Sequence, residues 1–194
     1  ISNLALWLTA SNVVADGGVV SRWTDLSPNN HQIVQNTPAL RPTAVANGLG
    51  ANPVVRFNGA QFLDGGNILN VGTNSRTYYL IGRINTGNGT FFAKAAYALT
   101  NNRFGFLREA GNFLFLHHDD TPRSASTLFP SAAFNFFKGV SNRTIAQNRL
   151  YINNSLMGTA ALTPTHNFVS NFNFLVGAIS NSAGVLPPQP GFFL

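Results

Sequence analysis

The runs Arg103-Phe104-Gly105-Phe106-Leu107-Arg108 and Asn112-Phe113-Leu114-Phe115-Leu116-His117 flank the spacer Glu109-Ala110-Gly111. Two short aromatic-rich runs around a Gly-containing spacer indicate a β-hairpin. Further along the chain, Asn171-Phe172-Asn173-Phe174-Leu175-Val176 begins with polar and apolar residues in alternation. This period of two is typical of a strand with one buried face. These stretches therefore predict strands in the middle and near the end of the chain.

Strand signals recur on both sides of these runs. Residues 4–8, 53–57 and 77–84 are rich in apolar, aromatic or β-branched residues and end close to turn residues. Residues 149–152 and 155–158 flank Asn153-Asn154, a pair that accepts positive φ in a tight turn. The sequence therefore predicts a second hairpin and three more strands.

Helices are not expected. The 194 residues include 18 Gly and 10 Pro, and the longest interval without either, residues 140–157, has no apolar period of 3.6. We therefore predict an all-β fold, a two-sheet antiparallel jelly-roll sandwich that forms a single domain over residues 1–194. We expect these residues to be enriched in its core: Phe104, Phe106, Phe113, Phe115, Leu150, Ile152, Phe172 and Phe174.

The composition excludes several classes of protein. Only 9% of the residues are charged, and the net charge of +6 comes from scattered single arginines and only six acids. Without a basic stripe we expect no nucleic-acid partner. The chain has no Cys, which excludes disulfides and thiolate chemistry. No run of about 18 apolar residues occurs, so we expect no membrane span.

The order of several motifs resembles the laminin-G-like domains of the concanavalin A-like lectin and glucanase superfamily, in their bacterial surface or secreted form. The motifs are Leu6-Trp7-Leu8-Thr9-Ala10-Ser11, Trp23-Thr24-Asp25-Leu26-Ser27, Arg41-Pro42-Thr43, Pro53-Val54-Val55-Arg56-Phe57-Asn58-Gly59, Leu150-Tyr151-Ile152-Asn153-Asn154 and Phe174-Leu175-Val176-Gly177-Ala178. The resemblance implies an extracellular, secreted or cell-surface module whose partner is a glycan or a surface protein.

The chain departs from that family pattern at three positions, two of them in turns, and at its end. Thr9, Pro28 and Asn58 stand where the family often has Asp, so we expect no cofactor; calcium stays open, although no strong carboxylate site is visible. The family usually closes with one more strand, whereas this chain stops at Gly191-Phe192-Phe193-Leu194. We expect the closing strand to come either from a continuation of a larger protein or from a strand-donating partner chain.

Three residues of the first motifs have expected structural roles. Trp7 and Trp23 are predicted to pack in the core, with sugar stacking as the alternative. Asp25, close to Ser27, is predicted to cap a turn by accepting backbone N–H groups.

One polar cluster is a candidate ligand site. His117-His118-Asp119-Asp120-Thr121-Pro122-Arg123 follows a predicted strand. Imidazoles and carboxylates suit a transition metal, but adjacent strand residues point to opposite faces, so we expect no metal here. A turn explains the same residues, and loops at the ends of sandwiches commonly carry binding sites. We therefore take His118, Asp119, Asp120 and Arg123 as the candidate ligand-contacting residues.

Signatures of catalysis are missing. Glu109 is the single Glu, whereas a glycosidase needs two placed carboxyl groups, and no G-x-S-x-G motif occurs. We therefore predict that the protein is not an enzyme and has no polysaccharide hydrolase or lyase activity. The sequence favours an extracellular binding or adhesion module. A structural spacer or assembly module of a surface or virion appendage is the alternative, and a carbohydrate-active enzyme is a weaker one.

Overall fold

The computed structural model describes residues 3–84, 87–95, 103–118, 124–128 and 133–180. The strands in chain order are β1 (Val13–Asp16), β2 (Val19–Thr24), β3 (Gln32–Val34), β4 (Thr43–Leu49), β5 (Asn52–Arg56), β6 (Leu63–Asp64), β7 (Arg76–Gly82), β8 (Gly89–Lys94), β9 (Arg103–Glu109), β10 (Asn112–His118), β11 (Ser124–Leu128), β12 (Asn135–Asn142), β13 (Gln147–Ile152), β14 (Ser155–Ala161) and β15 (Phe174–Val176). The one helical turn in these ranges is the 3₁₀ turn Pro38–Leu40. No helix in the described part of the chain is long and apolar enough to cross a membrane.

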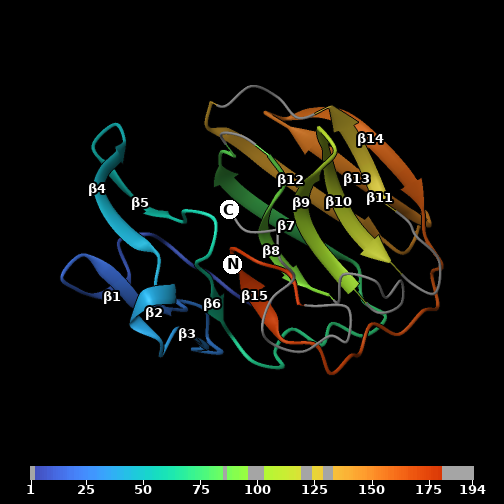
Figure 1. Cartoon of the computed structure of the whole chain (residues 1–194). Coiled ribbons are helices and arrows are strands. Elements are labelled where there is room, and N and C mark those ends of the chain that lie inside the picture. Colours follow the sequence, from blue (N-terminus) through green and yellow to red (C-terminus); the bar gives the residue numbers. More distant parts are fainter. Residues whose placement is uncertain (1–2, 85–86, 96–102, 119–123, 129–132, 181–194) are drawn as a thin grey trace.

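The strands form two antiparallel sheets (Figure 1). The larger sheet has the order β11-β10-β9-β8-β15-β6-β3-β2-β4-β5, and β1 pairs with β2 outside this path. The smaller sheet has the order β14-β13-β12-β7. The predicted all-β, two-sheet antiparallel sandwich is therefore confirmed. The predicted missing closing strand concerns residues after Ser180, outside the described ranges.

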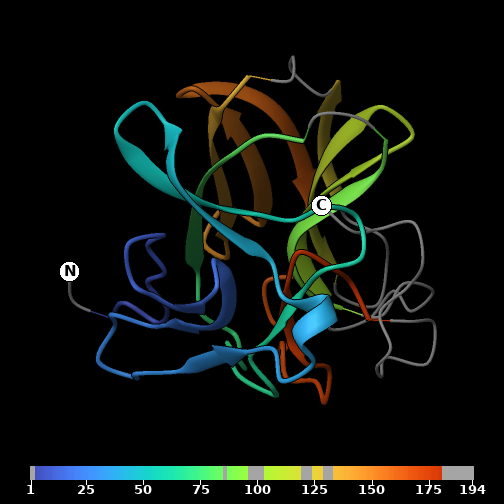
Figure 2. The ribbon, with the colours of Figure 1, turned by 60° about the vertical axis from the view of Figure 1, so that its left-hand side comes forward.

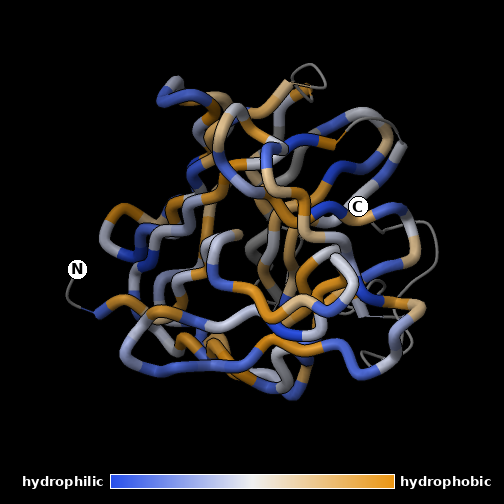
Figure 3. Tube along the Cα trace, turned by 90° about the vertical axis from the view of Figure 1, so that its left-hand side faces the viewer, coloured by the Kyte–Doolittle hydropathy of each residue, from blue (hydrophilic) through white to orange (hydrophobic). Residues whose placement is uncertain are grey.

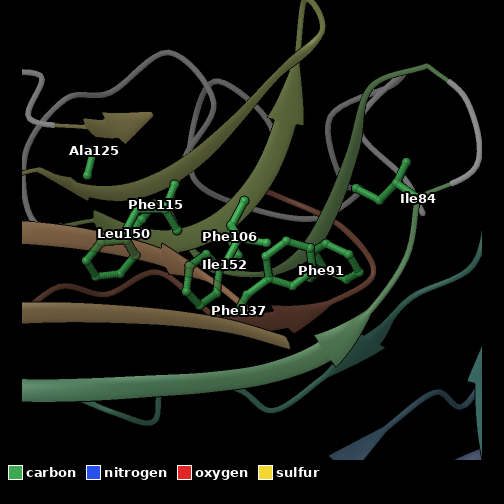
Figure 4. Close-up of a cluster of buried hydrophobic side chains, with 8 residues drawn as sticks. All are labelled: Ile84, Phe91, Phe106, Phe115, Ala125, Phe137, Leu150 and Ile152. Atoms are coloured by element: carbon green, nitrogen blue, oxygen red, sulfur yellow. The ribbon is translucent and has the colours of Figure 1, made fainter. Parts of the chain in front are cut away.

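Phenylalanines fill the space between the two sheets. Phe91, Phe106 and Phe115 come from neighbouring strands of the larger sheet and meet Phe137 of the smaller one (Figure 4). The rings of Phe106 and Phe115 have centroids 5.2 Å apart, a spacing typical of favourable aromatic pairs. Packing is so close that a Cβ added at Gly139 would lie 2.6 Å from the Phe115 ring and 2.8 Å from the Phe106 ring. This region is a close-packed interior.

A second apolar cluster lies under the N-terminal third of the chain, whose short strands extend the larger sheet away from the sandwich (Figures 1 and 2). Val20, Ile33 and Leu63 are buried in it together with Phe104 and Phe174. Hydrophobic and hydrophilic residues follow one another at short intervals along the trace on this side of the molecule (Figure 3). Short strands with one buried face account for this alternation.

Both predicted hairpins are present. In the first, Glu109 pairs with Asn112, so the turn consists of Ala110 and Gly111 and is one residue shorter than the predicted spacer. Both turn residues have positive φ, 48° and 81°, as a two-residue turn of this kind requires. In the second hairpin Asn153 and Asn154 have φ values of 48° and 71°, which confirms the predicted turn.

Several core predictions are confirmed. Phe104, Phe106, Phe115, Leu150, Ile152 and Phe174 are all buried. Phe172 is half-buried and precedes β15, which begins only at Phe174, so its predicted place in a strand and in the core is wrong. The chain bends into the sheet only at Phe174, whose N–H donates to the carbonyl of Gly66. The side chain of Phe113 lies outside the described part.

The predicted strand at residues 4–8 and the predicted core position of Trp7 are wrong. These residues belong to no strand, and Trp7 is 49% exposed. The segment is held by a turn instead of a neighbouring strand, because the N–H of Trp7 donates to the Asp25 carboxylate and the N–H of Leu26 donates to the carbonyl of Trp7. Trp23 packs partly buried against the second cluster, and its Nε1 donates to the carbonyl of Thr9 at 2.7 Å.

The capping role predicted for Asp25 is confirmed. Its carboxylate, on a side chain only 3% exposed, accepts hydrogen bonds from the N–H groups of Trp7, Ser27 and His31 and from the Ser27 hydroxyl. Burial raises the pKa of Asp25, but these hydrogen bonds outweigh it and hold the pKa below the ordinary value of 3.8. The carboxylate thus fixes the N-terminal segment to the turn at residues 25–31.

Candidate ligand-binding face

Three strands of the smaller sheet, β7, β12 and β13, alternate between a more buried and a more exposed face. Along β12 the residues are buried and half-buried in turn, and β13 shows the same pattern. In β7, Tyr78 faces the core and pairs with the rings of Phe92, Phe104 and Phe115, while Tyr79 points outward. The outward positions of the four strands make up the candidate face, which we call the outer face.

One cross-strand row dominates the outer face. The register aligns Tyr79 of β7 with Lys138 of β12, Lys138 with Tyr151 of β13, and Tyr151 with Leu156 of β14. The ammonium of Lys138 lies 4.1 Å from the centroid of the Tyr151 ring. This geometry is favourable for a cation–π contact, which holds the cation and the ring in fixed positions.

The next row extends the aromatic surface. Ile81 of β7 is aligned with Phe136 of β12, and the Phe136 ring stacks on Tyr79 with centroids 5.8 Å apart and planes 16° apart. Tyr79 is 64% exposed, Ile81 62% and Leu156 53%. An apolar patch this exposed and rimmed by polar groups is typical of an interaction site.

Polar groups border the aromatic rows on the other side. Arg149 of β13 is aligned with Val140 of β12, and its Nε donates to Oε1 of Gln147 at 3.1 Å. Two cations, an amide and phenol hydroxyls therefore lie beside flat apolar rings. Rings with polar tips and nearby donors suit ligands that combine apolar faces with hydroxyl groups, as sugars do.

The structure leaves the sequence-predicted ligand residues untested. His118 is the last residue of β10 and is paired with Arg103, but its side chain is not described. Asp119, Asp120 and Arg123 lie outside the described ranges. The structure therefore does not test whether these four residues act together.

Metal binding finds no support from the described residues, where no group of three or more His, Asp or Glu side chains is assembled. Two of the carboxylates accept hydrogen bonds that stabilise the local structure. Asp25 caps its turn, and Asp64 accepts hydrogen bonds from the N–H of Gly66 and from Nδ2 of Asn173. The absence of a cofactor, and calcium as the open alternative, stay predictions.

Sequence reasoning missed the outer face. Both Tyr78 and Tyr79 lie in a run that is apolar on both faces, so alternation alone does not say which ring is exposed. A weak signal did exist in residues 149–152, where Arg149 and Tyr151 alternate with Leu150 and Ile152. That pattern places a charge and a phenol on the same face of one strand.

Solved structures share the fold. The binding domain of Paraclostridial Mosquitocidal Protein 1 is 10% identical with a TM-score of 0.59, over 89% of this chain and 44% of that one. The botulinum neurotoxin serotype D binding domain is 14% identical with a TM-score of 0.55, over 89% of this chain and 43% of that one. This chain therefore spans less than half of either toxin domain.

A third similar structure covers nearly the whole of both chains. Domain 4 of AbnA, a GH43 extracellular arabinanase from Geobacillus stearothermophilus, in complex with arabinotriose, is 14% identical with a TM-score of 0.53, over 96% of this chain and 86% of that one. At these identities the likeness shows the β-sandwich fold alone. No family model and no curated protein matches the chain, so the laminin-G-like resemblance stays a prediction.

Proposed function

We propose that this domain is a non-catalytic binding module that holds a glycan against the outer face of the smaller sheet. The observation that carries the proposal is the exposed row Tyr79–Lys138–Tyr151 with Phe136 stacked beside it. Two of the solved structures with this fold are toxin binding domains and the third is an arabinanase domain in complex with arabinotriose, which supports binding as the role. A surface protein is the other partner that such a patch suits.

In this proposal the domain is extracellular and has no catalytic activity. The similar arabinanase is described as extracellular, which supports this location. The chain's only Glu, Glu109, ends β9 at a hairpin turn, and Asp25 is committed to its capping hydrogen bonds. Cleavage of a glycosidic bond needs two carboxyl groups that flank it, and these positions favour binding over hydrolysis.

A glycan array followed by calorimetry on the best ligand tests the proposal. We expect Tyr79→Ala and Tyr151→Ala each to weaken binding about tenfold, because a lost stacking contact of about 1.4 kcal/mol changes affinity by that factor. Val14→Ala on β1, an exposed apolar side chain away from this face, is the matched control and should bind like the wild type.

Two other variants distinguish the rival sites. Arg123→Ala probes the loop predicted from the sequence, and Trp7→Ala probes the exposed indole. If either of these abolishes binding while Tyr79→Ala does not, the outer face is not the ligand site. An array that stays blank for the wild type contradicts glycan binding and favours the structural spacer.

A further inference from the structure

The strands of the smaller sheet contain no acidic residue. The sequence has no Asp or Glu between residues 65 and 108 or between residues 121 and 194, and these stretches supply β7, β12, β13 and β14. The six acids of the chain are Asp16, Asp25, Asp64, Glu109, Asp119 and Asp120. The positive charges of the smaller sheet therefore have no carboxylate on their own strands to balance them.

Two cations are neighbours at the centre of the outer face. Lys138 of β12 is aligned with Tyr151 of β13, and Arg149, two residues before Tyr151, is aligned with Val140. Lys138 and Arg149 are thus diagonal neighbours, which lie roughly 7–8 Å apart on one face of an antiparallel pair. Their two positive charges are close enough to act on the same ligand.

A third cation lies at one end of this face. Arg83 follows β7 and is exposed, whereas its neighbours Gly82 and Ile84 are buried, so Arg83 continues the outward positions of the strand. Its guanidinium carbon lies 4.9 Å from the centroid of the Phe134 ring, just before β12. Phe134 precedes Lys138 by four residues, roughly 13 Å along a strand. Positive charge therefore extends along the outer face beside the aromatic rings.

The donors of Lys138 and Arg149 are available to a ligand. Nζ of Lys138 contacts the Tyr151 ring and makes no hydrogen bond or ion pair with any described residue. Nε of Arg149 donates to Gln147, which orients the guanidinium, while Nη1 and Nη2 make no hydrogen bond within the described part of the chain. An oriented guanidinium with two free amino groups matches the paired oxygens of an oxyanion.

We infer that the ligand of the outer face is an acidic glycan, whose carboxylate or sulfate groups pair with Lys138 and Arg149 while its sugar rings pack on the aromatic rows. This inference rests on the proposed function and names the class of glycan. A neutral glycan would cover these cations without supplying a counter-charge, and a charge that loses water without a partner is costly. An acidic glycan supplies that partner.

The surroundings of Arg149 favour a sugar over other acidic polymers. Thr77 of β7 and Thr159 of β14 are exposed and are aligned in the same cross-strand row as Arg149. Their hydroxyls can donate and accept hydrogen bonds, as sugar hydroxyls require. A single-stranded nucleic acid also combines charge with flat rings, but its binding proteins provide a positively charged groove that follows the backbone. Three separate cations do not form such a groove.

Calorimetry with two matched pairs of ligands tests the inference. One pair is an oligomer of galacturonic acid and its methyl ester, and the other is a sulfated oligosaccharide and its desulfated form. We expect the charged member of at least one pair to bind at least tenfold more tightly than its neutral partner, with a smaller preference at high salt. If neither charged member binds more tightly, the inference is overturned, while binding of neutral glycans leaves the proposed function standing.

Charge-removing variants locate the effect on the outer face. We expect Lys138→Gln and Arg149→Gln each to weaken binding of the charged ligand about fivefold, because each removes one charged partner. Arg22→Gln, at an exposed position of β2 in the larger sheet, removes the same charge and is the matched control, which should bind like the wild type. An equal loss in Arg22→Gln, or equally tight binding of a single-stranded oligonucleotide, would overturn the inference.

Discussion

The sandwich between β8–β11 and β12–β13 is closed, whereas a groove of about 1810 Å³ lies beside β7, lined by β7 and residues 4–10. Both regions are made from the same kinds of side chain. In the sandwich, phenylalanine rings of the two sheets pack against one another, and Gly139 is needed because even one added carbon would collide with Phe106 and Phe115. At the groove, leucines and phenylalanines of similar size line a hollow, and β7 pairs with β12 alone among the described strands. Apolar composition therefore does not decide whether a region is closed; strand pairing does.

Truncation in the closed region should have the largest effect. Phe106 is fully buried and its ring contacts Phe92, Phe115 and Phe137. We expect Phe106→Ala to lower the free energy of unfolding by about 3–5 kcal/mol, because a large cavity opens in a rigid surrounding. Urea denaturation measures this. A loss below about 1 kcal/mol would mean that the sandwich is no better packed than the groove.

A buried lysine of the larger sheet, Lys94, should give a pH-dependent stability. Lys94 of β8 is buried, its Nζ donates to Oδ1 of Asn67 at 2.6 Å and to the carbonyl of Phe172 at 2.7 Å, and burial lowers its pKa from 10.5 to about 8. Between pH 8 and 10 the unfolded chain binds more protons than the folded one, so stability should rise by roughly 2–3 kcal/mol.

The Lys94→Met variant is the control for that pH effect. Met carries no titrating group, so the rise between pH 8 and 10 should be absent when urea unfolding is repeated at each pH. Burial raises the pKa of the Tyr78 hydroxyl, which opposes the rise only above its ordinary value of 10.0. The same rise in wild type and variant would show that Lys94 is not its source.

Adding a methyl group to the close-packed core should lower stability less than removing a ring from it. A Cβ at Gly139 meets ring carbons at 2.6–2.8 Å, so Gly139→Ala should cost about 1–3 kcal/mol in unfolding free energy. Gly87, which has nothing within 4 Å of an added Cβ but a φ of 72°, is a comparison for backbone strain alone. If Gly139→Ala leaves the melting temperature unchanged, the rings of Phe106 and Phe115 can shift to make room, and the core is less tightly packed than these distances indicate.

The smallest loss of stability is expected at Trp7, which lines the groove. Trp7 is 49% exposed, and its backbone rather than its ring holds the segment to Asp25. We expect Trp7→Ala to change the unfolding free energy by less than about 1 kcal/mol, measured as for Phe106→Ala. A cost near that of Phe106→Ala would show that the indole is buried in solution.

The outer face shows which features of the candidate site could be predicted from the sequence. Tyr79 and Tyr151 both lie in stretches that the sequence predicts as strands. Tyr79 could not be assigned to a surface, because residues 77–84 are apolar on both faces, and only the alternation in residues 149–152 gave a weak signal for Tyr151. Trp7 was misplaced for the related reason that its short apolar run looks like a paired strand. Residues 4–8 pair with no strand among the described residues, and no local sequence pattern contains that information.

The sequence by itself determined the all-β class, both hairpins, the capping role of Asp25 and most of the aromatic core. These features rest on interactions between residues close in the chain, or on a period of two that any sheet imposes. The tertiary structure alone decided that β7 ends its sheet and residues 4–8 pair with no strand, both among the described residues, and that the Tyr79–Tyr151 row faces outward. Which strand ends a sheet and which face is covered depend on pairing between distant segments, so no single stretch of sequence encodes them.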